Sequence, residues 1–136
     1  MHKPWGRRKR IVLPDAELAV MKVLWGRGTA TIREIMEVLY PHGDTSEYAT
    51  VQKLLERLQA RGCVSRQRGP RANVYSATVD RNRLIREQLR EAADKLCGGS
   101  LSPILTQLVD AEHLSPEDIE TLRALVERLD HKEGEQ

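Results

Sequence analysis

The sequence predicts a mainly α-helical protein with one small β-hairpin, organised in two parts. Three short apolar patterns at helical spacing occupy most of residues 11–62, and a basic segment rich in β-forming residues follows at 63–79. Three more helical patterns fill residues 80–131. Three short helices followed by a hairpin are typical of a winged helix-turn-helix. We therefore expect such a domain at residues 11–79 and a helical dimerisation domain at residues 80–131.

Caps and apolar spacing define the first two helices. Asp15 is the expected N-cap of the first helix and Gly26 its expected end. Its apolar stripe is Leu18, Val20, Met21, Leu24 and Trp25. The second helix begins at a capping box formed by Thr31 and Glu34, and Pro41 ends it. Its apolar face is Ile32, Ile35, Met36 and Leu39.

The third helix has an apolar stripe on one side and small or hydrogen-bonding residues on the other. We expect Ser46 or Thr45 to cap it and Gly62 to end it. The stripe is Val51, Leu54, Leu55 and Leu58, and Ala49, Lys53, Glu56 and Ala60 lie opposite. A face of this kind can enter a DNA major groove, where Gln pairs with adenine, Lys with guanine and a Thr methyl touches thymine. The candidate base-reading residues are Ala49, Thr50, Gln52, Lys53 and Arg57; the alternative is a solvated helix face.

The strand-forming segment predicts a basic hairpin. Cys63–Arg68 and Asn73–Val79 flank a turn at Gly69–Pro70. Arg66, Arg68 and Arg71 crowd this turn. Arginines on a protruding hairpin can neutralise DNA phosphates, which gives affinity independent of sequence. The alternative is an ordinary basic turn.

Charge is unevenly distributed along the chain. Residues 1–80 hold 14 Lys and Arg against 8 Asp and Glu, a net charge of +6, whereas residues 81–136 have a net charge of −4. The imbalance indicates that the first half binds an anion, although chance variation in surface charge is an alternative. Met1–Arg10 is expected to be a flexible basic arm that either follows DNA or only aids solubility, and residues 132–136 form a tail.

The C-terminal helices favour association with a second copy. Three helices in about 50 residues are too few to enclose a core of their own, so a shared core in a homodimer is expected. The alternative is packing onto the N-terminal domain of the same chain. Ser115 and Pro116 are suited to start the last helix. The candidate dimer residues are Leu89, Leu96, Leu105, Leu108, Ile119, Leu122 and Val126.

Other classes of protein fit the sequence poorly. No apolar run reaches the ~18 residues of a membrane span and no secretory signal is present, so a cytoplasmic protein without membrane insertion is expected. The four histidines have no metal-ligand or catalytic spacing, and we expect no enzyme, cofactor or metal. Cys63 and Cys97 are expected to be small core residues. A winged-helix protein-interaction module without DNA binding is the main alternative, and the basic hairpin disfavours it.

Several segments resemble the penicillinase-repressor (BlaI/MecI/CopY) family. The likeness extends over Leu13–Leu129, and its clearest segments are Leu13–Trp25, Ala49–Leu58, Gly62–Val64, Tyr75–Ser76 and Leu114–Arg123. The resemblance implies a bacterial homodimeric repressor that binds a palindromic double-stranded DNA operator. It also implies that Thr50 and Gln52 contact operator bases and that residues 66–71 contact the DNA backbone.

The resemblance also implies two possible routes of induction. In many family members a membrane-bound sensor metalloprotease detects a β-lactam, and the repressor is cut at an Asn–Phe bond. The equivalent bond here is Gln107–Leu108, so the same protease specificity is not expected. Other members sense copper through Cys-x-Cys motifs near the C-terminus. The tail at Asp130–Gln136 has no cysteine, which excludes that route.

Overall fold

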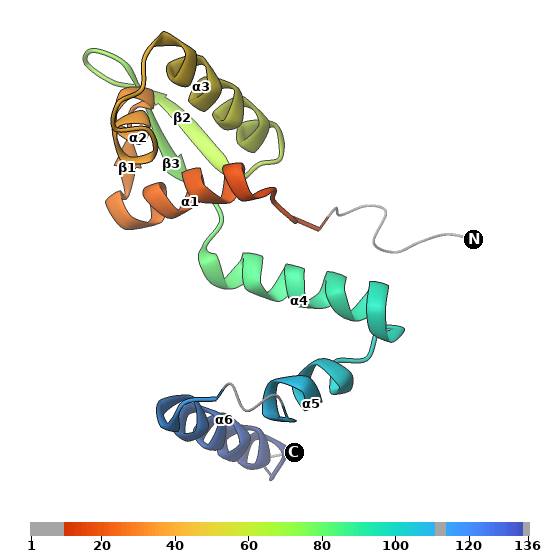
Figure 1. The fold of residues 1–136 in the computed structure, drawn as a ribbon. Coiled ribbons are helices and arrows are strands. Elements are labelled where there is room, and N and C mark those ends of the chain that lie inside the picture. The colour runs from red at the N-terminus through yellow and green to blue at the C-terminus, as the bar shows by residue number, and fades with distance from the viewer. Residues whose placement is uncertain (1–9, 111–113, 135–136) are drawn as a thin grey trace. The chain divides into compact units, whose positions relative to one another are not determined.

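The computed structural model describes residues 10–110 and 114–134, which form six helices and three strands (Figure 1). The chain divides into two compact units, and the division falls inside helix α4 (Arg81–Cys97), between Glu91 and Ala92. Residues 1–9 of the expected arm and residues 135–136 of the expected tail lie outside the described residues, as does His113. In the described ranges, no helix is both long and apolar enough to cross a membrane.

The first helix, α1 (Asp15–Arg27), starts and ends differently from the prediction. Its N-cap is Pro14, which makes no side-chain cap hydrogen bond, so the predicted Asp15 cap is wrong. Asp15 instead lies in the first turn, where a negative charge interacts favourably with the helix dipole. The helix continues past Gly26 and is capped at Gly28, whose φ of +88° suits a residue without a Cβ. The predicted end at Gly26 is therefore wrong.

The second helix, α2 (Ile32–Leu39), begins at the predicted capping box. The Glu34 backbone N–H donates to Thr31 Oγ1 at 3.1 Å, and the Thr31 N–H donates to Glu34 Oε1 at 2.8 Å. Because both hydrogen bonds satisfy free backbone donors at the helix start, the box fixes where α2 begins. The helix stops two residues before Pro41, as predicted.

The third helix, α3 (Thr45–Ala60), has a second capping box that we did not predict. Asp44 is the N-cap, and the Ser46 N–H donates to its Oδ1 at 2.9 Å, while the Asp44 N–H donates to Glu47 Oε2 at 2.9 Å. The predicted caps Ser46 and Thr45 are therefore wrong. Asp44 has a glutamate three positions later, which is the spacing that a capping box requires. Gly62 follows the helix with φ of +76°, as its predicted role requires.

The first unit also contains a three-stranded antiparallel sheet in the order β1-β3-β2, whose first strand lies between α1 and α2 in the chain. The predicted hairpin is confirmed as β2 (Val64–Arg68) and β3 (Asn73–Ala77), somewhat shorter than the predicted segments. Strand β1 (Thr29–Ala30), which pairs with Ser76 and Tyr75 of β3, was not predicted. A two-residue strand is too short to show alternation in sequence. The combination is a winged helix-turn-helix, so the predicted fold class is confirmed.

One hydrophobic core holds the helices and the sheet of the first unit together. The whole predicted stripe of α3 is buried, and Val64 and Tyr75 close the core from the sheet. The largest fully buried side chains are Met21, Leu24, Ile35, Leu55, Leu58, Val20, Val51 and Cys63. Because the leucine side of α3 is fixed in this core, its opposite side is turned to solvent.

The start of α4 belongs to the first unit, where Leu84 is buried in the core. Glu87 Oε1 accepts a hydrogen bond from the Ile11 N–H at 2.7 Å, and Trp25 Nε1 donates to the Val79 carbonyl at 2.9 Å. The second unit contains the end of α4, α5 (Ser102–Asp110) and α6 (Pro116–Gly134). Ser115 caps α6 by accepting from the Asp118 N–H at 3.0 Å, which agrees with the predicted start.

Replacing Glu34 with Gln should reduce the loss of stability in acid. The hydrogen bond from the Thr31 backbone, followed by the Arg27 guanidinium, holds the pKa of Glu34 below its usual value. A carboxylate with a lowered folded-state pKa stabilises the protein above the unfolded-state pKa, and this contribution disappears as the pH falls below about 4.3. Gln keeps the box without the charge. Thermal melts should therefore show a difference between wild type and Glu34→Gln at neutral pH that shrinks in acid, whereas Glu37→Gln should melt like wild type at neutral pH.

Candidate nucleic-acid interface

The exposed side of α3 carries the residues that were predicted from the sequence to read bases. Ala49, Thr50, Gln52, Lys53 and Arg57 are all exposed, and so is Glu56 between them. The Thr50 hydroxyl donates to the Ser46 carbonyl at 3.1 Å. Its hydrogen is used within the helix, so any contact of Thr50 with a base comes from its methyl group or from the hydroxyl as an acceptor.

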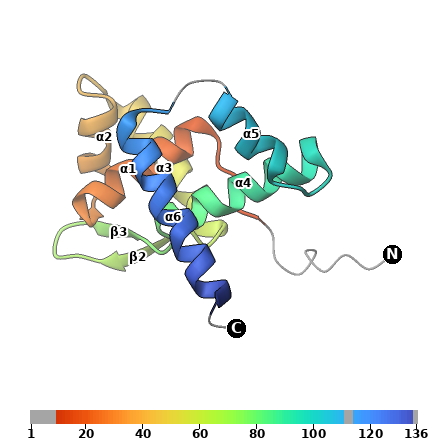
Figure 2. The ribbon, with the colours of Figure 1, turned by 90° about the horizontal axis from the view of Figure 1, so that it is seen from below.

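The wing, which consists of β2, β3 and the loop of residues 69–72 that connects them, places its arginines in a defined register. Arg66 pairs with Tyr75 and Arg68 with Asn73 across the hairpin, while Arg71 lies in the connecting loop. Residues two apart on a strand share a face, so Arg66 and Arg68 lie on the same face of β2 as Val64. Val64 is buried in the core, whereas all three arginines are exposed. The hairpin loop protrudes from the first unit in both views (Figure 1, Figure 2).

The cations of α3 and the wing lack the carboxylate partners that four arginines elsewhere in the described part of the first unit have. Within the described part of the chain, Lys53, Arg57 and the three wing arginines form no ion pair. Elsewhere in the first unit, carboxylates neutralise the arginines of four pairs: Arg10–Glu91, Arg27–Glu34, Arg61–Glu17 and Arg83–Glu87. Unneutralised cations gathered beside one helix face form a surface that attracts an anion.

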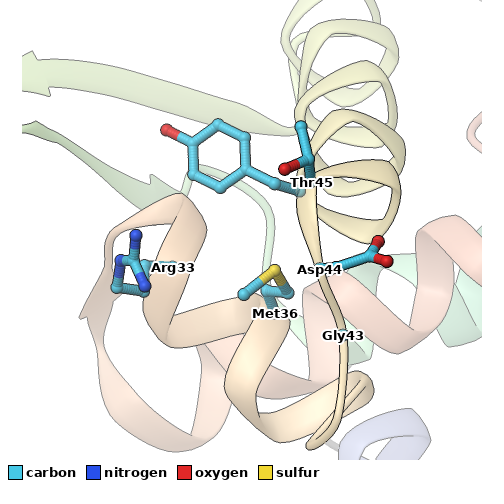
Figure 3. A pocket seen from close by; sticks show the side chains of 6 residues that line it. Arg33, Met36, Gly43, Asp44 and Thr45 are labelled. Carbon is cyan, nitrogen blue, oxygen red and sulfur yellow. The ribbon is translucent and has the colours of Figure 1, made fainter.

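Two side chains next to this surface were not predicted as part of it. Arg33 of α2 and Tyr48 of α3 are exposed, and both line two hollows. The larger hollow, of about 730 Å³, extends from the start of α2 to Arg71 in the wing loop and to Asn73 at the start of β3. The smaller, of about 430 Å³, continues to Asp44 and Thr45 (Figure 3). The fold brings Arg33 and Arg71 together from distant parts of the sequence, so neither apolar spacing nor a motif could have indicated the pair.

The second unit has almost no core within a single chain. Among its described residues, Ala93 is the only buried hydrophobic one. Leu96 of α4 is 81% exposed, and α6 has an apolar stripe that is exposed along its length, formed by Ile119, Leu122, Leu125, Val126 and Leu129. The candidate dimer residues Leu89, Leu96, Leu105, Leu108, Ile119, Leu122 and Val126 are all exposed, and Gln107 and Leu108 lie exposed within helix α5.

The cysteines differ in their surroundings. Cys63 is fully buried in the core of the first unit, and burial raises the pKa of its thiol above the usual range. A buried neutral thiol behaves as a small apolar side chain, as predicted. Cys97 is half-buried rather than a full core residue. Among the residues that the structure describes, no three His, Cys, Asp or Glu side chains gather as a metal site.

Comparison with known proteins gives a consistent result over nearly the whole chain. A family model described as penicillinase repressor matches residues 13–128. The penicillinase repressor of Bacillus licheniformis is 26% identical over 125 residues, covering 90% of this chain and 95% of the relative. The methicillin resistance regulatory protein MecI of Staphylococcus aureus (strain N315) is 24% identical over 120 residues, covering 88% of this chain and 97% of the relative.

Among solved structures, one similar protein is Bacillus licheniformis BlaI, in its monomeric form in complex with the blaP half-operator. It is 31% identical, with a TM-score of 0.46, and the alignment covers 55% of this chain and 90% of that chain. The assignment rests on the family model, which spans most of the sequence and includes the segments that carried the resemblance. This chain belongs to the penicillinase repressor family.

Proposed function

We propose that this chain is a bacterial transcriptional repressor that acts in the cytoplasm, binds a palindromic operator as a homodimer and is released by an inducing signal. The observation that carries the proposal is the exposed face of α3 beside cations that, among the described residues, have no ion-pair partner. Membership of a family whose relatives are named repressors supports it. A protein-interaction module fits less well, because the centres of protein interfaces are depleted in charge.

In this proposal α3 lies in the major groove and reads base edges. Gln52 offers a bidentate amide for adenine, and Lys53 offers an ammonium for guanine. Thr50 contributes its methyl group, since its hydroxyl donates to the helix backbone. Arg66, Arg68 and Arg71 contact phosphates, which set the position of the protein on the duplex without selecting the sequence.

The homodimer follows from the exposed apolar surface of the second unit. This unit has 45 residues, of which the described ones bury a single hydrophobic side chain. A unit of this size does not reach a stable core alone, and a large apolar surface in a polar chain marks an association site. A second copy offers the same apolar residues, and two-fold symmetry would present two α3 helices to half-sites one helical turn, ~34 Å, or a multiple apart.

Release of DNA requires dissociation of the dimer, and cleavage within α5 would achieve this. The Gln107–Leu108 bond lies inside this nine-residue helix and is exposed. So short a helix is marginal by itself, and it must open before the bond reaches a protease. A membrane-bound sensor metalloprotease is the partner that the family resemblance proposes, with a bond preference that differs from Asn–Phe.

The proposal is tested by comparing two substitutions on a footprinted fragment from upstream of the gene and on a random duplex. Gln52→Ala should cost roughly 1–3 kcal/mol on the specific site and little on random DNA, because it removes a base contact. Arg68→Ala should weaken binding to both about equally, because it removes a phosphate contact. Gel shifts measure both. Equal losses on the two duplexes for Gln52→Ala would contradict base reading, and a wild-type protein that binds no duplex would contradict the proposal itself.

A further inference from the structure

The groove between α2, α3 and the wing loop has the chemistry of an anion site. Arg33 of α2 and Arg71 of the wing loop both line it, and neither forms an ion pair with a described residue. No Asp or Glu is among the residues that line it. Tyr48 and Asn73 add neutral hydrogen-bond donors. Two guanidiniums without a lining carboxylate favour a ligand with negative charge, and Arg is well matched to phosphate oxygens.

The adjoining hollow has one carboxylate, and this carboxylate does not line the groove itself. Asp44 lines the adjoining hollow (Figure 3). Its carboxylate accepts the Ser46 N–H as the helix cap. Hydrogen bonds with Glu47 and the Ser46 backbone lower the pKa of Asp44, so this carboxylate stays ionised, but it does not line the groove that Arg33 and Arg71 line. Arg33 is the cation shared by both hollows.

The position of the groove identifies the source of the anion. Tyr48 directly precedes Ala49 and lies one helical turn before Gln52, so it borders the face proposed to read bases. Arg71 belongs to the wing loop, which is proposed to contact the DNA backbone. A backbone that passes from the wing along the start of α3 therefore crosses this groove.

We propose that the groove binds one phosphate of the DNA backbone in each half-site, with charge from Arg33 and Arg71 and a neutral hydrogen bond from the Tyr48 hydroxyl. The inference rests on the proposed function and adds two residues to its interface, Arg33 and Tyr48. A phosphate held at the start of α3 fixes the depth and register of the helix in the major groove, since phosphate contacts position and base contacts specify.

The experiment measures binding of the full-length protein to the footprinted duplex over a series of salt concentrations. Arg33→Gln should weaken binding about tenfold for each half-site at low salt, the effect of losing one charge-assisted hydrogen bond. The slope of log affinity against log salt should also fall, but by less than the value of about 0.9 for each phosphate that loses all its neutralising charge, because Arg71 remains at the phosphate. Tyr48→Phe should also weaken binding but keep the wild-type slope, because it removes a neutral donor. Lys22→Gln, an exposed charge on α1 that does not line the groove, is the matched control and should bind like wild type.

The outcomes separate a failure of the phosphate site in the groove from a failure of the proposed DNA-binding function. If wild type binds the duplex and both groove variants match Lys22→Gln in affinity and slope, the groove inference is wrong while the proposed function stands. If wild type binds no duplex, the proposed function fails. Titration with inorganic phosphate in the absence of DNA tests a free anion as occupant. Saturable phosphate binding that Arg33→Gln abolishes without changing DNA affinity would overturn the DNA assignment. All three altered side chains are exposed, and thermal melts verify that the variants fold.

Discussion

Leu122→Asp is expected to give monomers and to weaken operator binding by roughly 10²–10⁴-fold, the advantage that two linked reading domains have over one. Leu122 lies on α6 in a stripe with Ile119, Leu125, Val126 and Leu129, and every member is exposed in the single chain. In the proposed dimer this stripe is covered by the second copy. A carboxylate buried in such an apolar contact loses its hydration without gaining a partner, which disfavours association.

Ala124→Asp is the matched control on the same helix. At 3.6 residues per turn, Ala124 lies on the side of α6 opposite the centre of the stripe, and it too is exposed in the single chain. Both substitutions add one carboxylate at a position that is exposed in the single chain. A difference in oligomeric state between the two variants therefore indicates that only Leu122 lies in the interface. Sedimentation equilibrium should show monomers for Leu122→Asp and dimers for Ala124→Asp. Dimers for both variants would place the interface away from α6.

The orientation of α3 was predictable from the sequence because its periodicity is strong. Val51, Leu54, Leu55 and Leu58 repeat at helical spacing, and all four are buried. Their burial fixes which side faces solvent, so the exposure of Gln52 and Lys53 followed directly. The hairpin was predictable for a similar reason, since a Gly-Pro turn separates two segments of β-forming residues.

Element boundaries were less predictable, because neighbouring residues offered the same local signal. Gly26 and Gly28 both suit a helix end, and only the positive φ at Gly28 distinguishes them. Asp44, Thr45 and Ser46 are all good caps in sequence. The spacing from Asp44 to Glu47 matches a capping box and would have identified the correct one. Strand β1 exists only through its pairing with β3, and a non-local pairing of two residues leaves no sequence pattern.

Residues of the candidate interface could be predicted from the sequence only where they lie on a single element. The α3 face and the wing are each continuous in sequence, so their residues could be nominated one element at a time. Arg33 and Tyr48 face one groove with Arg71 only after α2, α3 and the hairpin have packed together. The apolar stripes of the second unit were visible as helical patterns. A single chain leaves them exposed, because the surface proposed to cover them belongs to another copy.

DNA binding is expected to weaken by roughly 10³–10⁵-fold between about 50 and 200 mM salt, the range for 6–10 phosphate contacts. Arg66, Arg68 and Arg71 alone give a dimer about six such contacts, the lower end of that range. These guanidiniums are exposed and have no ion-pair partner among the described residues, so no protein carboxylate must be displaced before DNA binds. The steep salt dependence therefore originates in counterions released from the duplex.

Replacing the three wing arginines together with Gln should lower the salt slope by about 0.9 for each phosphate left without its arginine, or roughly five in a dimer. The matched control replaces Arg123, Arg128 and Lys132 of α6 with Gln, which removes the same charge from exposed positions of the second unit. Fluorescence anisotropy over a salt series should show a reduced slope for the wing variant and the wild-type slope for the control. Equal slopes in the two triple variants would mean that net charge, and not the wing, sets the salt dependence. In the proposed function the wing acts through specific phosphate contacts, so we expect the same removal of charge to have an effect only where the protein holds the DNA backbone.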